Sequence, residues 1–242
     1  MALNSSKIKG GGNGGNRVEQ PVIDAGVYPS RIVQMLDLGL QNQRPYQGKD
    51  KPPANEVMIT YELVDSFMID EKGNELEDKP RWISETLPLY DITKADKAKC
   101  TQRYNAADPT NAFGGDFSQI VDVPVNVSLV HNQQGEKLYV NVANIAAMRP
   151  KDAAKCPALK NPPKVFDLDE PDMEVFNSLP DWVQDKIKKN LNFNGSKLFD
   201  ILYKNPAMGI KAGIEAERVT RQEQLEQTAQ VQEESAEDKP WD

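Results

Sequence analysis

Clean period-two alternation in two segments, residues 56–64 and 122–131, constrains the fold of this chain more than any other feature. An extended strand points successive side chains to opposite faces, so this spacing predicts strands with one buried face. The residues expected on the buried faces are Val57, Ile59, Tyr61, Leu63, Val123, Val125, Val127 and Leu129. Residues 26–38, 81–89 and 137–146 are rich in Val, Ile and Leu and complete a set of five expected strands.

A segment of different character separates the third and fourth expected strands. Residues 91–107 lack the alternation and favour a helix, with Asp91 as the expected N-cap and Pro109 barring its continuation. The order of three strands, one helix and two strands is typical of the OB-fold barrel, whereas a sandwich needs more strands. We therefore expect a mainly β fold, a five-stranded OB-fold barrel with a helix between strands three and four.

Composition divides the chain into four expected parts. Residues 1–20 are rich in Gly and Asn and predict a flexible arm, and residues 21–148 form the barrel domain. Residues 149–205 are expected to be an acidic, Pro-rich linker followed by a helical extension. Residues 206–242 are expected to be a flexible acidic C-terminal tail.

The helical extension is expected to hold two short helices. Ser178 is the expected N-cap of the first, and Ser196 caps the second after a break at residues 194–195. The expected apolar stripe of the first helix is Trp182, Val183, Ile187 and Leu191. This pair is expected to pack on the barrel or on another subunit, so a homodimer stays open.

The net charge of −8 is unevenly distributed along the chain. Residues 1–163 carry only −1, residues 164–185 and 213–242 carry −6 each, and residues 186–212 carry +5. A nearly neutral body can still present a basic face, so the low overall charge does not exclude a phosphate-binding groove.

Several kinds of chemistry find little support in the sequence. His131 is the only histidine, which argues against most zinc sites and histidine triads. The glycine run at 10–15 lacks the features of a nucleotide loop, and the acidic residues at 167–174 lack calcium-loop spacing. Cys100 and Cys156 are expected to be reduced thiols. We expect no enzyme activity, no cofactor, no metal and no membrane segment.

Cations interleaved with aromatic side chains point to single-stranded nucleic acid, which needs positive charges along its phosphates and flat surfaces for its bases. On an OB barrel these come from strands two and three and from the loops joining strands one to two and four to five. The candidate binding residues are Arg31, Arg44, Tyr46, Lys49, Lys51, Arg81, Trp82, Lys137 and Tyr139. Trp82 and Tyr139 are out of step with their apolar neighbours and are expected to be exposed, whereas Tyr61 is expected in the core. Arg103 is expected on a solvated helix face.

The chain resembles the OB-fold single-stranded DNA-binding proteins of tailed bacteriophages over about residues 20–190. The resemblance is carried by residues 24–28 (DAGVY), 59–63 (ITYEL), 79–81 (KPR) and 179–182 (LPDW). It implies sequence-independent coating of single strands during phage DNA replication, recombination and repair, in the cytoplasm of the infected bacterial host.

The resemblance also implies a role for the C-terminal tail, since such proteins usually end in acidic residues with a terminal aromatic or apolar residue. The expected tail residues, which would bind replication or recombination proteins, are Glu233, Glu234, Glu237, Asp238, Trp241 and Asp242. An indole flanked by carboxylates suits a partner pocket with a basic rim. The alternative for the tail is a solubilising appendage. For the whole chain, the alternatives are a virion structural or assembly protein and, with least support, a nuclease.

Overall fold

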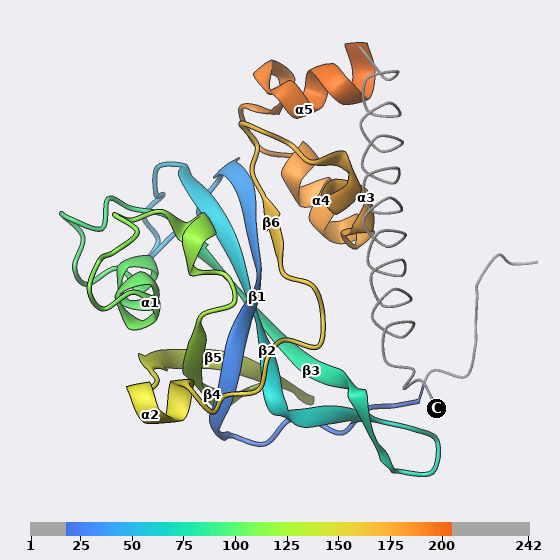
Figure 1. Cartoon of the computed structure of the whole chain (residues 1–242). Helices are drawn as coiled ribbons and strands as arrows, with labels where there is room; N and C mark the ends of the chain where they lie inside the picture. The colour runs from blue at the N-terminus through green and yellow to red at the C-terminus, as the bar shows by residue number, and fades with distance from the viewer. Residues whose placement is uncertain (1–17, 205–242) are drawn as a thin grey trace, which may run out of the picture.

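The structure, a computed structural model, describes residues 18–204 and is mainly β. Strands β1 (Gly26–Gln41), β2 (Ala54–Ile69) and β3 (Glu75–Pro88) pair antiparallel in sequence order. Strands β4 (Pro124–Gln134) and β5 (Lys137–Ala147) form a hairpin whose β4 pairs with the first part of β1. The sheet therefore has the order β3-β2-β1-β4-β5 (Figure 1).

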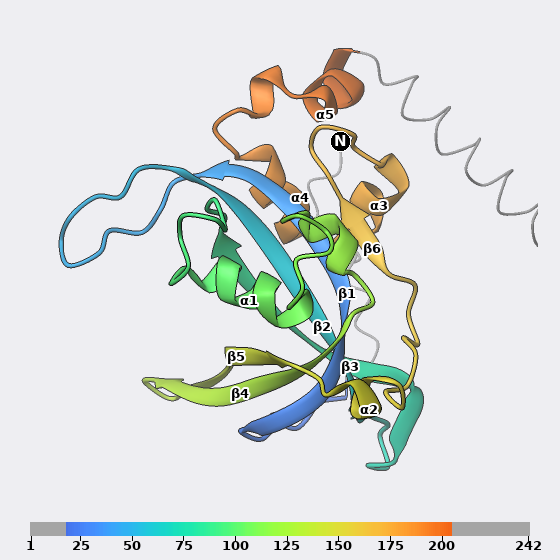
Figure 2. The ribbon, with the colours of Figure 1, turned by 60° about the vertical axis from the view of Figure 1, so that its left-hand side comes forward.

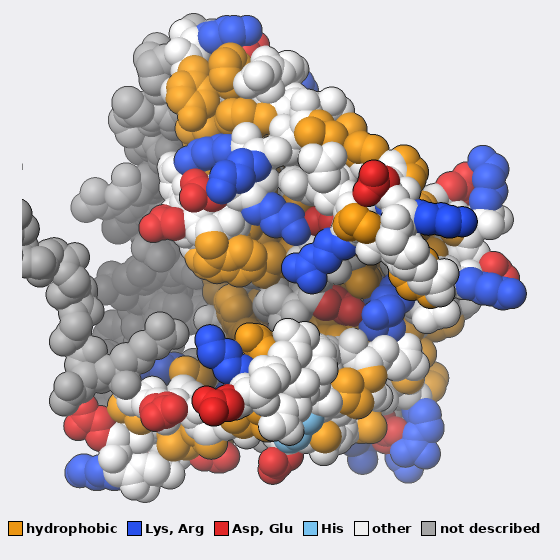
Figure 3. Space-filling model, turned by 180° about the vertical axis from the view of Figure 1, so that it is seen from behind, with side chains coloured by type: hydrophobic (Ala, Val, Ile, Leu, Met, Phe, Trp, Pro, Cys, Tyr) orange, Lys and Arg blue, Asp and Glu red, His pale blue; other side chains and the backbone are white. Residues whose placement is uncertain are grey.

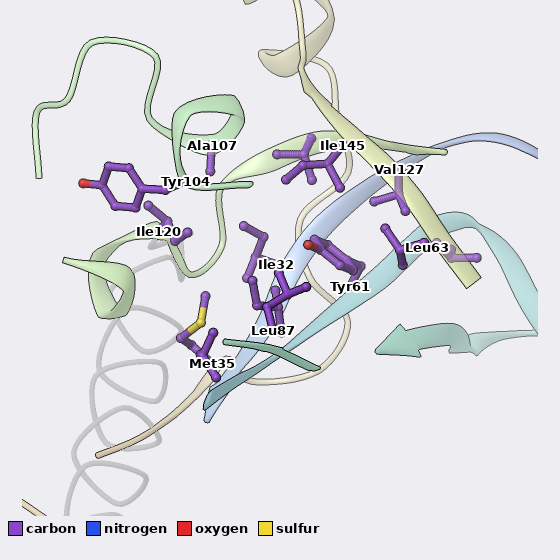
Figure 4. Packing of buried hydrophobic residues seen from close by; sticks show 14 of the residues in the cluster. Ile32, Met35, Tyr61, Leu63, Leu87, Tyr104, Ala107, Ile120, Val127 and Ile145 are labelled. Carbon is purple, nitrogen blue, oxygen red and sulfur yellow. The ribbon is translucent and has the colours of Figure 1, made fainter. Parts of the chain in front are cut away.

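The sheet curls until its two ends approach each other. Parts of β3 and β5 have Cα atoms within 8 Å, but these strands do not pair, so within residues 18–204 the sheet stays open. Its concave face, called here the inner face, holds the inner core. Val57, Ile59, Tyr61 and Leu63 belong to this core, as their alternation predicted. Val125, Val127 and Leu129 join it from β4, and Val123 packs against them. Figure 4 shows Tyr61 and Leu63 within this core.

Helix α1 (Lys99–Ala107) and the short 3-10 helix η2 (Phe117–Ile120) cover the inner core between β3 and β4. The expected position of this helix is thus confirmed, and it ends before Pro109 as predicted. Its expected start is wrong, because Asp91 caps a separate turn through the backbone and hydroxyl of Thr93. The run of residues 91–98 forms turns, and α1, whose N-cap is Ala98, begins seven residues later than expected.

Arg103 is buried, which corrects the expectation that it lies on a solvated helix face. Its guanidinium is 2.7 Å from Glu85 on β3, and it also donates to Asn144 and to the carbonyl of Ala143 on β5. Tyr61 donates to the same Glu85 carboxylate, and burial, reinforced by that carboxylate, raises the pKa of Tyr61 well above its usual value. One ion-paired network thus ties α1 to the two open ends of the sheet.

The opposite, outer face of β1 and β2 is also buried, by a second layer that the sequence did not predict in full. Leu36, Leu38 and Met58 pack there against Phe166 and the C-terminal helices and form the outer core. The elements of this layer are β6 (Lys164–Phe166), α3 (Met173–Ser178), α4 (Asp181–Lys188), η3 (Phe193–Gly195), α5 (Lys197–Phe199) and η4 (Asp200–Lys204). The short helix α2 (Pro150–Ala153) precedes them in the chain and has no buried residue. β6 pairs parallel with β1 at residues 34–36, beyond the part of β1 that pairs with β4 (Figure 1).

A glycine lets this layer dock closely on β1. Gly39 has a φ of 72°, and a Cβ placed on it would lie 2.7 Å from the Asn190 side chain, so no other residue fits without displacement. One residue further on, Leu40 accepts a 2.8 Å hydrogen bond from the backbone of Leu191. The helical extension expected over residues 178–204 is therefore packed on the sheet of its own chain.

Several details of the extension differ from the sequence-based expectation. Ser178 ends α3 and donates to the carbonyl of Val175, so it does not cap α4, whose N-cap is Pro180. Val183 and Ile187 are buried as expected, but Trp182 and Leu191 are 60% and 50% exposed. Ser196 does cap α5, by accepting the backbone N–H of Phe199.

The boundaries of the expected parts also shift. The connection expected over 65–80 is mostly strand, because β2 runs to Ile69 and β3 starts at Glu75. The Gln20 side chain exchanges two hydrogen bonds with the backbone of Ile69, so residue 20 is fixed to the end of β2 instead of lying in a free arm. Residues 1–17 of the arm and the whole of the expected tail, residues 206–242, lie outside the described residues.

We predict that Arg103→Ala lowers the free energy of unfolding by about 3–5 kcal/mol, because it leaves the Glu85 carboxylate buried without its cation. Urea unfolding measures the loss. Lys99→Ala, at an exposed position of the same helix, is the matched control and should change stability by less than about 0.5 kcal/mol. A loss no larger than that of the control would show that the network does not stabilise the fold.

Candidate nucleic-acid interface

The loop between β1 and β2, residues 42–53, carries four of the candidate residues and exposes all of them. Tyr46 and Lys49 exchange two backbone hydrogen bonds around Gln47 and Gly48, whose φ angles are both positive. This is the geometry of a two-residue hairpin turn of the primed type. The turn holds Tyr46 at 61% exposure instead of leaving it in an irregular loop.

Tyr46 lies beneath a cation. The ammonium of Lys51 is 4.9 Å from the centre of the Tyr46 ring, within the range of a cation–π contact. Among residues 18–204, neither Lys51 nor Arg44 forms an ion pair with a carboxylate. The loop therefore offers a flat ring and free positive charges side by side.

The second group of candidates lies at Arg81 and Trp82 on β3. Trp82 is 38% exposed, whereas its neighbour Ile83 packs against the inner core, so the expected alternation of these two residues is confirmed. Arg81 is half-buried, and desolvation lowers the pKa of its guanidinium, which still stays protonated at neutral pH.

Glu62, on β2 opposite Trp82, fixes the orientation of the indole. It accepts a 3.0 Å hydrogen bond from the Trp82 ring nitrogen. The same buried carboxylate accepts the backbone N–H of Lys160 at 2.6 Å and the side-chain amide of Asn161 at 2.8 Å. Sequence reasoning missed Glu62, because a Glu on the outer face of an alternating strand looks solvent-exposed.

The segment that Glu62 holds, residues 156–166, is called here the crossing segment, since it leads across the outer face to β6. Arg31 holds its other end, by donating to the carbonyls of Cys156 and Pro157 and to Asp122. All three guanidinium nitrogens of Arg31 are thus used within the protein, and its side chain is only 16% exposed. Arg31 therefore has a structural role in holding the crossing segment, and its role in binding a ligand stays a prediction.

The third group lies in the β4–β5 hairpin. Lys137 and Tyr139 are exposed there, Tyr139 at 44%, opposite Gln134 and Asn132 respectively. This hairpin and the 42–53 loop project from the same side of the molecule (Figure 2).

The reverse of the view in Figure 1 shows a hollow across the middle of the surface, with Lys and Arg side chains gathered above it and to its right (Figure 3).

A pocket of about 520 Å³ opens beside the loop. Of the candidates, it brings together Arg44 and Lys51, and it adds Thr86 from β3 and Lys186 from α4. Sequence reasoning missed Lys186, because nothing in the sequence indicates that α4 docks beside a loop some 140 residues earlier. The other candidates do not line this pocket.

The described part of the chain shows few other chemical centres. Within residues 18–204 no cluster of three His, Cys, Asp or Glu side chains is placed to hold a metal ion, and both cysteines are free thiols. No described helix is long and apolar enough to span a membrane. The tail residues expected to bind partners lie outside the described residues.

Comparison with known proteins adds no family assignment. No protein-family model matches the chain, and no curated protein matches it either.

We predict that Glu62→Ala releases the crossing segment, because the Lys160 amide then loses its acceptor. Amide hydrogen exchange at Lys160 should become faster, and the free energy of unfolding should fall by roughly 1–3 kcal/mol. Glu77→Ala, which removes an exposed carboxylate from β3, should change neither. Unchanged exchange at Lys160 in Glu62→Ala would mean that Glu62 does not hold the segment.

Proposed function

We propose that this chain is an OB-fold protein that binds single-stranded DNA without sequence preference and without catalysis. The observation that carries the proposal is the exposure of Tyr46, Trp82 and Tyr139, at 61%, 38% and 44%, beside Lys and Arg side chains. Single strands bind to such combinations of aromatic rings and cations, since each unpaired base has a face to stack and each phosphate a charge to neutralise.

The strand order supports the OB-fold part of the proposal. In an OB barrel, β1 pairs with both β2 and β4, a helix joins β3 to β4, and the barrel is partly open between β3 and β5. The order β3-β2-β1-β4-β5, the position of α1 and the approach of β3 to β5 agree with this arrangement. The three groups of exposed candidates lie on β3 and on the two connections that bind oligonucleotides in OB-folds.

The biological setting of the proposal follows from the phage resemblance. The protein would coat single strands during phage DNA replication, recombination and repair in the infected bacterial cytoplasm. Its last ten residues would recruit replication or recombination proteins, with Trp241 as the anchor among carboxylates.

We predict that the protein binds single-stranded oligonucleotides more tightly than duplexes of the same sequence. Affinity should fall with salt, with a slope of log affinity on log salt of about −0.7 for each phosphate contacted. Fluorescence anisotropy at a series of salt concentrations measures both. Equal affinity for single strands and duplexes would contradict stacking of unpaired bases.

Aromatic variants refine this titration. Tyr46→Ala should weaken single-strand binding by about 1–3 kcal/mol if a base stacks on this ring. Tyr90→Ala removes an exposed tyrosine outside the candidate set and is the matched control. Trp82→Phe is preferable to Trp82→Ala, since it keeps a stacking surface and removes only the hydrogen bond to Glu62.

We predict that deletion of residues 233–242 removes binding of replication or recombination proteins and raises affinity for single strands at low salt. The gain should shrink as salt rises, because screening weakens competition between the acidic tail and the DNA. Trp241→Ala should reduce partner binding alone. Pull-downs from infected cells, run beside DNA titrations, measure both effects. If the deletion changes neither, the tail serves only solubility.

A further inference from the structure

The pocket beside the 42–53 loop is built from two parts of the chain that lie far apart in sequence. Its lining includes residues 41–44, Lys51, Glu56 and Thr86 from the sheet and its loop, and Lys186 from α4. A volume of about 520 Å³ falls within the range of about 300–1,000 Å³ that is usual for small-molecule sites. Amide, hydroxyl and cationic side chains are the groups that contact sugar and phosphate in nucleic-acid complexes.

The two parts are held together by specific hydrogen bonds. The Gln41 side chain donates to the carbonyl of Leu38 at the end of β1 and to the carbonyl of Lys186 in α4. The backbone of Leu191 donates to Leu40, and Gly39 allows the close approach of Asn190. The helix is thus fixed against the base of the loop, and Lys186 is held in position relative to Arg44 and Lys51.

The charge balance in the pocket is positive. Lys186 lies 2.6 Å from Glu56, whose other carboxylate oxygen accepts a hydrogen bond from Gln43. The Glu56 side chain is 12% exposed and the Lys186 side chain 33%, so Lys186 remains partly accessible to solvent. Because Arg44 and Lys51 have no carboxylate partner among residues 18–204, the three cations outnumber the one carboxylate.

We propose that this pocket is a sugar-phosphate subsite of the nucleic-acid interface, so that the helical extension binds the strand together with the barrel. The bound single-stranded DNA would run from β3 past Thr86 and then between the cations of the 42–53 loop and α4. Lys186 would contact a phosphate on the side facing Arg44 and Lys51. This inference rests on the proposed function and assigns part of the site to an element outside the barrel.

The test measures the salt dependence of single-strand affinity for the full chain and its variants. Lys186→Gln should make the slope of log affinity on log salt shallower by about 0.7, the loss of one phosphate contact. Lys186→Arg keeps the charge and should keep the slope. Lys188→Gln changes the net charge equally on the same helix, but its ammonium lies over the Phe176 ring, so it should leave the slope nearly unchanged.

A folding control separates binding from packing. Lys186→Gln leaves the Glu56 carboxylate without its cation, so the double variant Glu56→Gln/Lys186→Gln is measured with it, and thermal unfolding is followed for each. The double variant should show the same loss of slope as the single variant.

The outcomes distinguish the two proposals. If the wild-type chain binds single strands but Lys186→Gln and Lys188→Gln have the same slope, the subsite is overturned and the proposed function stands. If the wild-type chain binds no single strands, both are overturned. A loss of slope that is specific to Lys186 and restored by Arg supports the subsite.

Discussion

Burial of β1 and β2 on both faces is the constraint on which the rest of the structure depends. Val57, Ile59 and Tyr61 fill the inner core, while Met58, Thr60 and Glu62 between them are buried on the outer side. A strand buried on both faces must have every polar group satisfied. Thr60 hydrogen-bonds to Ser84 and Gln34 on the neighbouring strands. Glu62 accepts three hydrogen bonds, two of them from the crossing segment, so its burial depends on that segment.

This constraint limits where a ligand can bind. The inner face is filled by the core and α1, and the outer face of β1 and β2 is covered by the crossing segment and the C-terminal helices. The exposed candidate side chains lie on the 42–53 loop, β3 and the β4–β5 hairpin, and Lys186 on α4 is partly exposed. The proposed path of the DNA follows these elements, and the buried Glu62 and the half-buried Arg31 keep the crossing segment in place.

Much of the main sheet could be predicted from the sequence, because its signals are local. Alternation predicted the inner residues of β2 and β4, and the change of pattern after β3 predicted a helix. Trp82 was predicted to be exposed because the adjacent Ile83 points to the opposite, inner face of the strand. The exposed loop with Tyr46 and Lys51 was also recognisable. By contrast, the expected exposure of Arg103 was wrong, because an arginine looks the same in sequence whether it faces solvent or is paired in the interior.

The sequence by itself determined the strands, their inward faces and the helix between β3 and β4, since these depend on side-chain periodicity within short segments. Only the tertiary structure decided where the helical extension, residues 178–204, packs against the sheet. Gly39, Gln41 and Lys186 meet because α4 docks on β1, and that contact depends on the close approach of segments about 150 residues apart. Contacts between segments so far apart produce no repeating pattern in the sequence, because each residue is suited to a neighbour that only the folded chain brings near it.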